Sequence, residues 1–217
     1  MSLLHRASFQ VTIASSDQLR QGGGLVPGLP EVAFVGRSNA GKSTAINLLC
    51  NQKRLAFASK TPGRTQHLNY FAIADRDRTY GYLVDLPGYG YAAASGAEAR
   101  SHWDEFLGGY LRDRAELRGV VLIMDARRPL TDLDVQLIDW LSHAGKPIHA
   151  LLSKCDKLNR SETAQALQQV RAAFANTPHT VQVFSALKRI GLEEADQRVL
   201  GWLGVAPETD KDRSPKK

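Results

Sequence analysis

Residues 36–43 read Gly-Arg-Ser-Asn-Ala-Gly-Lys-Ser, which fits the Gly-x4-Gly-Lys-Ser/Thr pattern of a phosphate-binding loop. The short apolar run 31–35 before it predicts a buried strand, and residues 44–49 after it predict a helix. Glycines let the backbone N–H groups of such a loop face phosphate oxygens at a helix N-terminus. Lys42 would reach the β- and γ-phosphates, and Ser43 would offer its hydroxyl to Mg²⁺. The alternative for the motif alone is a glycine turn beside an exposed lysine.

Apolar strand runs alternate with helical stretches along the rest of the chain. The strand runs are 31–35, 68–74, 80–84, 120–124, 148–152 and 181–184, and the helical stretches are 44–49 and about 98–117, 132–143, 161–175 and 191–203. A short polar turn at 75–78 predicts an antiparallel hairpin, whereas most other strands are separated by helices. This order predicts an α/β, three-layer fold: a mostly parallel six-stranded sheet with one antiparallel strand and helices on both faces.

The two ends of the chain differ in composition from this middle part. Residues 1–29 are expected to form an N-terminal arm and a Gly/Pro linker, within which 9–13 alternates like an edge strand. Residues 205–217 are polar and basic, which predicts a disordered tail. We therefore expect one main domain over residues 30–204.

The chain is basic, with a net charge of +6 and a pI of about 9.4, which favours a polyanionic partner. The basic clusters are Lys53, Arg54, Lys60 and Arg64; Arg112, Arg114 and Arg118; Arg127 and Arg128; and Lys211, Arg213, Lys216 and Lys217. The two cysteines have no ligand spacing and suggest a reducing compartment, and no apolar run approaches the ~18 residues of a membrane span. We expect a cytoplasmic protein without a membrane span, and a monomer because no coiled-coil seam is present.

Two polar motifs lie near the predicted carboxyl ends of strands, where ligands of parallel sheets bind. Asp85-Leu-Pro-Gly88 follows the run 80–84; its carboxylate could hold Mg²⁺ through a water, and the Gly88 N–H could meet a γ-phosphate. The segment 61–65 (Thr-Pro-Gly-Arg-Thr) lies in a long polar connection, where Thr65 could give the metal a second hydroxyl. Either motif alone is also typical of an ordinary turn. The prediction of a nucleotide site therefore depends on the order of the motifs along the chain.

Two later segments predict recognition of a guanine base. Ser153-Lys-Cys-Asp156 follows the run 148–152, and Asp156 can accept hydrogen bonds from the guanine N1–H and 2-amino group, which adenine does not offer in that arrangement. Lys154 can lay its aliphatic stem over the ring. A backbone N–H of the segment 185–187 (Ser-Ala-Leu) could meet the guanine O6. A helix cap would explain either serine alone.

Together these segments resemble the translation-factor-type GTPases, with five guanine-nucleotide loops in their usual order. More narrowly, the chain resembles the EngB (YihA/YsxC) family of ribosome-assembly GTPases, in the TrmE–Era–EngA–EngB–septin superfamily. The resemblance covers about residues 30–204 and rests on the segments 36–43, 60–66, 69–71, 85–91, 154–157 and 185–188, of which 61–65 and 85–91 are the most discriminating. It implies a P-loop GTPase fold, Mg²⁺-dependent GTP binding and hydrolysis, a role in assembling the large ribosomal subunit with rRNA as partner, and a link to normal cell division and septation.

The resemblance also implies the residues of the site. GTP or GDP would be bound by Gly36, Arg37, Ser38, Asn39, Ala40, Gly41, Lys42, Ser43, Thr44, Gly63, Arg64, Thr65, Gln66, His67, Asp85, Leu86, Pro87, Gly88, Ser153, Lys154, Cys155, Asp156, Phe184, Ser185 and Ala186. Mg²⁺ would be held by Ser43, Thr65 and, through a water, Asp85, while Lys42, Thr65 and Gly88 would act in catalysis. Asn39 is a hypothetical K⁺ ligand, the alternative being a hydrogen bond from its amide that shapes the loop.

Two positions depart from the wider pattern. The guanine loop begins with Ser153 in place of Asn or Thr. We expect the preference for guanine to be kept, and the property that the change puts in doubt is the rigidity of the base pocket. Tyr89 stands where Ras-like enzymes place a water-orienting Gln, which predicts slow intrinsic turnover, and Tyr89 itself is either a partner contact or a packing residue. Two other functions stay open: an RNA-binding module that holds guanine nucleotide with negligible turnover, and a P-loop ATPase or kinase, against which Lys154-x-Asp156 argues.

Overall fold

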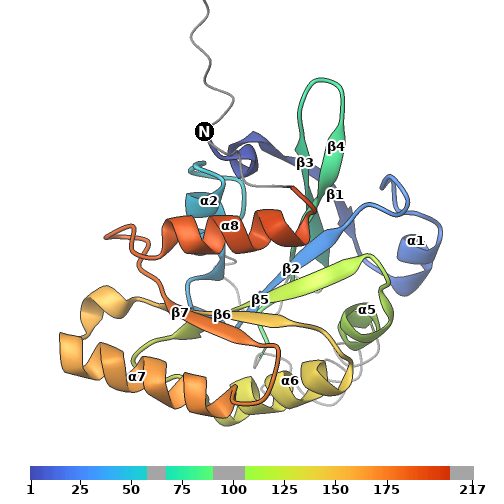
Figure 1. The fold of residues 1–217 in the computed structure, drawn as a ribbon. Coiled ribbons are helices and arrows are strands. Elements are labelled where there is room, and N and C mark those ends of the chain that lie inside the picture. The colour runs from blue at the N-terminus through green and yellow to red at the C-terminus, as the bar shows by residue number, and fades with distance from the viewer. Residues whose placement is uncertain (58–66, 90–105, 206–217) are drawn as a thin grey trace, which may run out of the picture.

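The computed structural model describes residues 1–57, 67–89 and 106–205, in which a seven-stranded sheet lies between two layers of helices (Figure 1). The strands are β1 Ala7–Ile13, β2 Glu31–Gly36, β3 Leu68–Ala74, β4 Thr79–Asp85, β5 Leu117–Asp125, β6 Ile148–Ser153 and β7 Thr180–Val183, in the spatial order β1-β3-β4-β2-β5-β6-β7. β3 is antiparallel to both of its neighbours, and every other pair is parallel. The predicted α/β fold, with a mostly parallel sheet and one reversed strand, is confirmed.

The expected count of six strands is wrong, because the N-terminal segment adds a seventh. β1 pairs with β3 along its whole length, with a register shift between Phe9 and Val11. Ala7 and Ile13 at its ends are buried, whereas Phe9 is 58% exposed. The alternation over 9–13 indicates an edge strand, and the pairing with β3 joins that strand to the main sheet.

Helices cover both faces of the sheet, as predicted (Figure 1). On one face lie α2 Lys42–Leu49 and α8 Leu192–Trp202, and on the other α5 Gly108–Asp113, α6 Asp132–His143 and α7 Arg160–Ala173; the remaining short elements are α1 Ser16–Arg20 and the 3-10 turns Leu3–Arg6 and Cys155–Lys157. In β5, Leu122 and Met124 enter one hydrophobic cluster, while Val121 and Ile123 enter the other. A strand buried on both faces needs a continuous apolar run, which explains why 120–124 shows no polar alternation.

The long helical stretch predicted at about 98–117 differs from the observed structure. Residues 98–105 lie outside the described residues, and α5 ends at Asp113. Arg114 is extended and donates two hydrogen bonds, of 3.0 and 2.6 Å, to the buried carboxylate of Glu31 at the start of β2. This contact turns the chain back toward the sheet, so Leu117 begins β5 instead of ending a helix.

The helices after β5 begin where the sequence predicts. α6 and α7 each start with a capping box, formed by Thr131 with Asp134 and by Asn159 with Glu162. Within the described ranges, no helix is both long and apolar enough to cross a membrane. The basic tail lies outside these ranges from residue 206 onward.

Candidate functional site

The phosphate-binding loop joins β2 to α2 at the carboxyl edge of the sheet. Asn39 and Gly41 have φ angles of 62° and 103°, and Gly41 is the N-cap of α2. Ala40 donates to the Arg37 carbonyl at 3.0 Å, whereas the N–H groups of Asn39 and Gly41 have no acceptor among the described residues. The first N–H groups of a helix also lack intrahelical partners. The loop therefore presents unpaired donors beside a helix N-terminus, an arrangement suited to phosphate.

Two glycines allow a close approach of backbone at this edge. A Cβ on Gly36 would lie 2.9 Å from the Ile123 carbonyl oxygen on β5, and a Cβ on Gly88 would lie 3.2 Å from the Ser38 nitrogen. The loop after β4 thus lies directly beside the phosphate-binding loop. The expected contact between the Gly88 N–H and a γ-phosphate requires this proximity.

Lys42 and Asp85 form an ion pair between the first turn of α2 and the end of β4. Only 12% and 7% of their side chains are exposed. Ser43 follows Lys42, and a hydroxyl with a carboxylate supplies the oxygen ligands that Mg²⁺ takes. The described residues contain no group of three or more His, Cys, Asp or Glu side chains that could hold a metal. Thr65 lies outside the described ranges.

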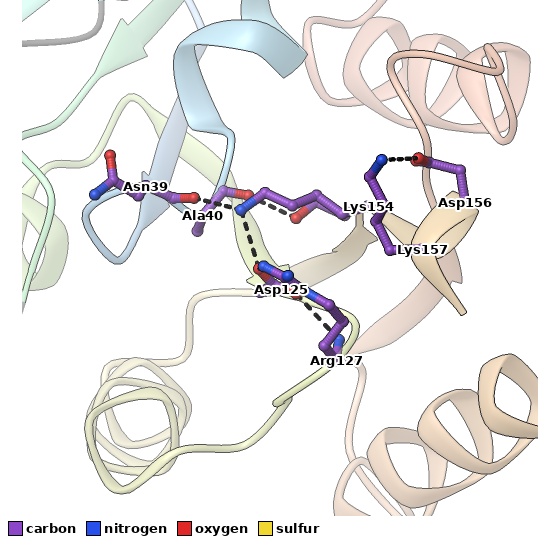
Figure 2. A network of polar contacts seen from close by, with 8 residues as sticks. Asn39, Ala40, Asp125, Arg127, Lys154, Asp156 and Lys157 are labelled. Carbon is purple, nitrogen blue, oxygen red and sulfur yellow. Dashed lines mark hydrogen bonds and ion pairs between the residues drawn. The ribbon is translucent and has the colours of Figure 1, made fainter.

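The last residue of β6 and the residue after it contact the phosphate-binding loop (Figure 2). Ser153 is 4% exposed and donates its hydroxyl to the Ala40 carbonyl at 2.5 Å. Lys154 has a left-handed backbone, with φ of 59°, and its Nζ donates to the Asn39 carbonyl at 2.7 Å. Two consecutive residues therefore fasten this segment to the loop. Serine at position 153 is therefore in direct contact with the loop.

Asp156 and Ser185 connect the ends of β6 and β7. The Ser185 hydroxyl donates to the Asp156 carboxylate at 2.5 Å. The Ser185 N–H donates to the Ile190 carbonyl at 3.1 Å, so this N–H is not free for the expected contact with guanine O6. The N–H groups of Ala186 and Leu187 have no acceptor in the described part of the chain and remain the candidates of that segment.

Asp125, the last residue of β5, is a polar residue of this region that the sequence reasoning missed (Figure 2). Its carboxylate accepts two hydrogen bonds from the Arg127 guanidinium, at 2.9 and 2.7 Å, and one from Lys154 Nζ at 3.0 Å. The Arg127 guanidinium is the largest cause that holds the pKa of Asp125 well below its usual range; burial opposes it and Lys154 adds to it. The signal was available, because Asp125 ends an apolar run as Asp85 does.

The remaining predicted site residues fall into three groups. One group lies outside the described residues: Gly63, Arg64, Thr65 and Gln66. His67 comes directly after them, and its buried Nδ1 has no hydrogen-bond partner in the described part. Leu86, Cys155 and Phe184 are buried in the hydrophobic core, so only their backbone could face a ligand. Thr44 is exposed and Pro87 is half-buried.

Tyr89, directly after Gly88, is a packing residue with 5% of its surface exposed. Its hydroxyl donates to the Asp134 carboxylate at 2.5 Å, and the N–H and hydroxyl of Thr131 donate to the same carboxylate at 2.9 and 2.8 Å. Arg37 of the phosphate-binding loop forms a β-bridge with Tyr89, and its Nε lies 3.8 Å from Asp134. Burial and the Asp134 carboxylate raise the pKa of Tyr89. Of the two alternatives for Tyr89, the described contacts support packing.

The basic cluster expected at Arg112, Arg114 and Arg118 is largely neutralised. Arg112 pairs with Asp113 at 2.8 Å, and Arg114 pairs with the buried Glu31 at 2.6 Å. Arg118 alone of the three has no ion-pair partner within the described residues.

Residues 31–154 match the model of the family described as 50S ribosome-binding GTPase. The chain is 54% identical to the probable GTP-binding protein EngB of Paraburkholderia xenovorans, with 93% of each chain covered, and 50% identical to that of Cupriavidus taiwanensis, with 99% of this chain and 92% of the relative covered. A crystal structure of a probable GTP-binding protein engB aligns with a TM-score of 0.63 at 20% identity, over 80% of this chain and 98% of that one. An Aquifex aeolicus Era variant bound to GDP and AlF4⁻ aligns with a TM-score of 0.55 at 20% identity, over 83% of this chain and 64% of that one. At such identities, the solved structures support the fold alone.

Proposed function

The chain belongs to the EngB family of GTP-binding proteins and is a GTPase, and we propose that it acts as a slow, Mg²⁺-dependent switch in assembly of the large ribosomal subunit. The description of the matching family, 50S ribosome-binding GTPase, supports a ribosomal partner. The link to normal cell division and septation belongs to the same proposal and is supported by family resemblance. We take residues 30–204 as the G domain, with β1 at its sheet edge and 205–217 as a basic tail.

The observation that carries the nucleotide-binding part of the proposal is the hydrogen bond from Ser153 to the Ala40 carbonyl. It joins the segment proposed for the base to the loop proposed for the phosphates, the two parts that one nucleotide would bridge. The two parts come from β6 and β2, which lie on either side of β5. Ligands of parallel sheets bind at this edge.

In the proposed mechanism, hydrolysis is phosphoryl transfer to water, helped by positioning and by neutralisation of charge. Lys42 would exchange its pairing with Asp85 for the β- and γ-phosphates, and the unpaired loop N–H groups with that of Gly88 would hold phosphate oxygens as charge develops. Ser43, Thr65 and, through a water, Asp85 would hold Mg²⁺, whose chemistry is to neutralise phosphate charge. The Tyr89 hydroxyl is engaged by Asp134 and cannot orient a water, which favours slow turnover.

Asn39 is our candidate ligand for K⁺. Its carbonyl accepts a hydrogen bond from Lys154, whereas its side-chain amide makes none within the described residues. The alternative, loop shaping by the amide, therefore has no contact to support it there. Equal GTPase rates in K⁺ and in Na⁺ would rule out the K⁺ role.

The proposed partner is rRNA of the large subunit, contacted by a monomer in the cytoplasm. The loops 50–67 and 86–101, which lie partly outside the described residues, would become ordered with GTP and form the docking surface. Arg118 and the basic tail would supply phosphate contacts, so association should weaken steeply with salt.

A second function, from another class, is an RNA-binding module that holds guanine nucleotide with negligible turnover; the net charge of +6 favours it too. The test is GTP turnover measured with and without purified large ribosomal subunits. Stimulation by the subunits supports the switch, and turnover at background in both conditions supports the module. Competition by ADP equal to that by GDP would contradict guanine recognition in either case.

A further inference from the structure

We propose that Asp125 is a positioning residue of the nucleotide site, which holds the Lys154 head group so that the lysine stem forms a fixed platform for the base before nucleotide binds. The inference rests on the proposed guanine-nucleotide function. It extends that function to a residue outside the segments that carry the family resemblance.

The side chain of Lys154 is held at both of its ends. At one end, the backbone leaves β6 in a left-handed conformation, with φ of 59°. At the other, Nζ donates to the Asn39 carbonyl at 2.7 Å and to the Asp125 carboxylate at 3.0 Å (Figure 2). About a third of the side chain (34%) remains exposed. A stem stretched between two fixed points offers an open apolar surface to a planar ring.

Asp125 is itself held in place. Arg127 donates to its carboxylate from Nε at 2.9 Å, from the terminal guanidinium nitrogen at 2.7 Å and from the backbone N–H at 3.1 Å. Asp125 is 8% exposed and ends the strand between β2 and β6. The Ala126 N–H donates to the Ser153 carbonyl at 2.8 Å, which fixes the chain after it. The carboxylate therefore cannot turn away from Lys154 without breaking these contacts.

This arrangement predicts an effect of Asp125 on nucleotide affinity that is opposite in sign to the effect of its charge alone. A lysine side chain that is already ordered loses less conformational entropy when a base stacks on it. Removal of the Asp125 charge should therefore weaken nucleotide binding. By Coulomb's law alone, removal of a negative charge near an anionic ligand should strengthen it. The sign of the effect separates positioning from bulk charge.

The first experiment compares the full-length protein with Asp125→Asn, which keeps the shape of the side chain and removes its charge. The probe is fluorescently labelled GDP, with the dissociation constant and dissociation rate measured by stopped flow. We expect the dissociation constant to rise at least fivefold, mainly through faster dissociation. An unchanged or lower dissociation constant would overturn the proposal.

The second experiment repeats Asp125→Asn in a Lys154→Met background, which keeps an apolar stem but lacks the head group. Because Asp125 is proposed to act through that head group, the substitution should now change the dissociation constant by less than twofold. The same weakening in both backgrounds would show that Asp125 acts elsewhere. Arg128→Gln is the matched control, since it removes an exposed charge from the same loop and should leave the constant within twofold.

Arg127→Gln provides a second route if Asp125→Asn does not fold. It keeps the Asp125 charge but removes two of the contacts that orient the carboxylate. We therefore expect a smaller rise in the dissociation constant for GDP than with Asp125→Asn, and no rise in the Lys154→Met background. Persistence of that weakening with Lys154→Met would contradict the proposal. If the wild-type protein does not bind labelled GDP, the proposed function fails and this inference with it. Normal GDP binding without coupling between Asp125 and Lys154 defeats this inference alone.

Discussion

The Ser153 hydroxyl donates a hydrogen bond of 2.5 Å to the Ala40 carbonyl and so ties the end of β6 to the phosphate-binding loop. Both residues are buried, with 4% and 2% exposed. In the proposed site, the loop holds the phosphates and the β6 segment holds the base. A contact that keeps the two at a fixed separation therefore prepares the protein for one ligand that spans both.

Ser153→Ala tests this contact. The substitution leaves the buried Ala40 carbonyl without its hydrogen bond, at a cost of about 1–3 kcal/mol in the free energy of unfolding. We expect a lower melting temperature and faster GDP release. Ser161→Ala, at an exposed position on α7, is the control and should change neither. Wild-type stability and GDP release in Ser153→Ala would show that the contact is dispensable.

Asp85→Asn tests the proposed Mg²⁺ contact. In the wild-type protein, removal of Mg²⁺ with EDTA should speed GDP release, because the metal neutralises phosphate charge. In Asp85→Asn, which weakens the water-mediated contact, the ratio of release rates with and without Mg²⁺ should fall at least fivefold. Asp132→Asn at the start of α6 is the exposed control. An unaltered ratio in Asp85→Asn would remove Asp85 from the metal site.

Tyr89→Phe separates packing from catalysis. The change deletes a hydroxyl that donates to buried Asp134, so the protein should lose about 1–3 kcal/mol of stability by urea denaturation. Tyr80→Phe, in the more exposed hairpin where the hydroxyl bonds Asp75 at 2.6 Å, should cost less. The GTPase rate should change less than tenfold. A rate more than tenfold slower would give Tyr89 a catalytic part.

His149 should make stability depend on pH. Its ring is buried and bonds Thr180 and Gln182, each at 2.8 Å. Burial lowers the pKa of His149 from 6.5 to about 4, so its contribution is fully present above pH 6.5 and is lost as the pH falls toward 4. The free energy of unfolding lost in this way between pH 6.5 and pH 4 amounts to about 3 kcal/mol. Burial also lowers the pKa of His179, which adds in the same direction.

Urea denaturation between pH 4.5 and pH 7 checks this dependence on His149. His149→Gln should flatten the fall in the free energy of unfolding over that range. His143→Gln, at an exposed site on α6, should keep the wild-type slope. Equal slopes for His149→Gln and wild type would contradict the assignment.

Much of the fold was predictable because strands buried on both faces leave continuous apolar runs, as 120–124 and 148–152 do. The edge strand β1 was harder to assign, because only its end residues are fully buried and its partner β3 is distant in sequence. The end of α5 depends on the pairing of Arg114 with Glu31, a contact between residues far apart that no local pattern encodes.

The candidate site shows the same division. Local motifs indicated the loops, because glycine spacing and strand-end carboxylates are visible in the sequence. The contact of Asp125 with Lys154, which lies 29 positions away in the sequence, follows from tertiary packing. The hydrogen bond from the Ser185 N–H to the Ile190 carbonyl closes a local turn whose geometry no motif indicated. The burial of Tyr89 against Asp134 likewise depends on where α6 begins. The roles predicted for Thr65 and its neighbours stay predictions, because residues 58–66 lie outside the described part of the chain.

The central claim is that the nucleotide state controls association with the large ribosomal subunit. Its most direct test is sedimentation of the protein with purified ribosomal subunits, in the presence of a non-hydrolysable GTP analogue or GDP, at two salt concentrations. We predict co-migration with the large subunit in the GTP-like state, little with GDP, and less at high salt. Failure to co-migrate in either nucleotide state, or equal binding in both, would contradict the switch.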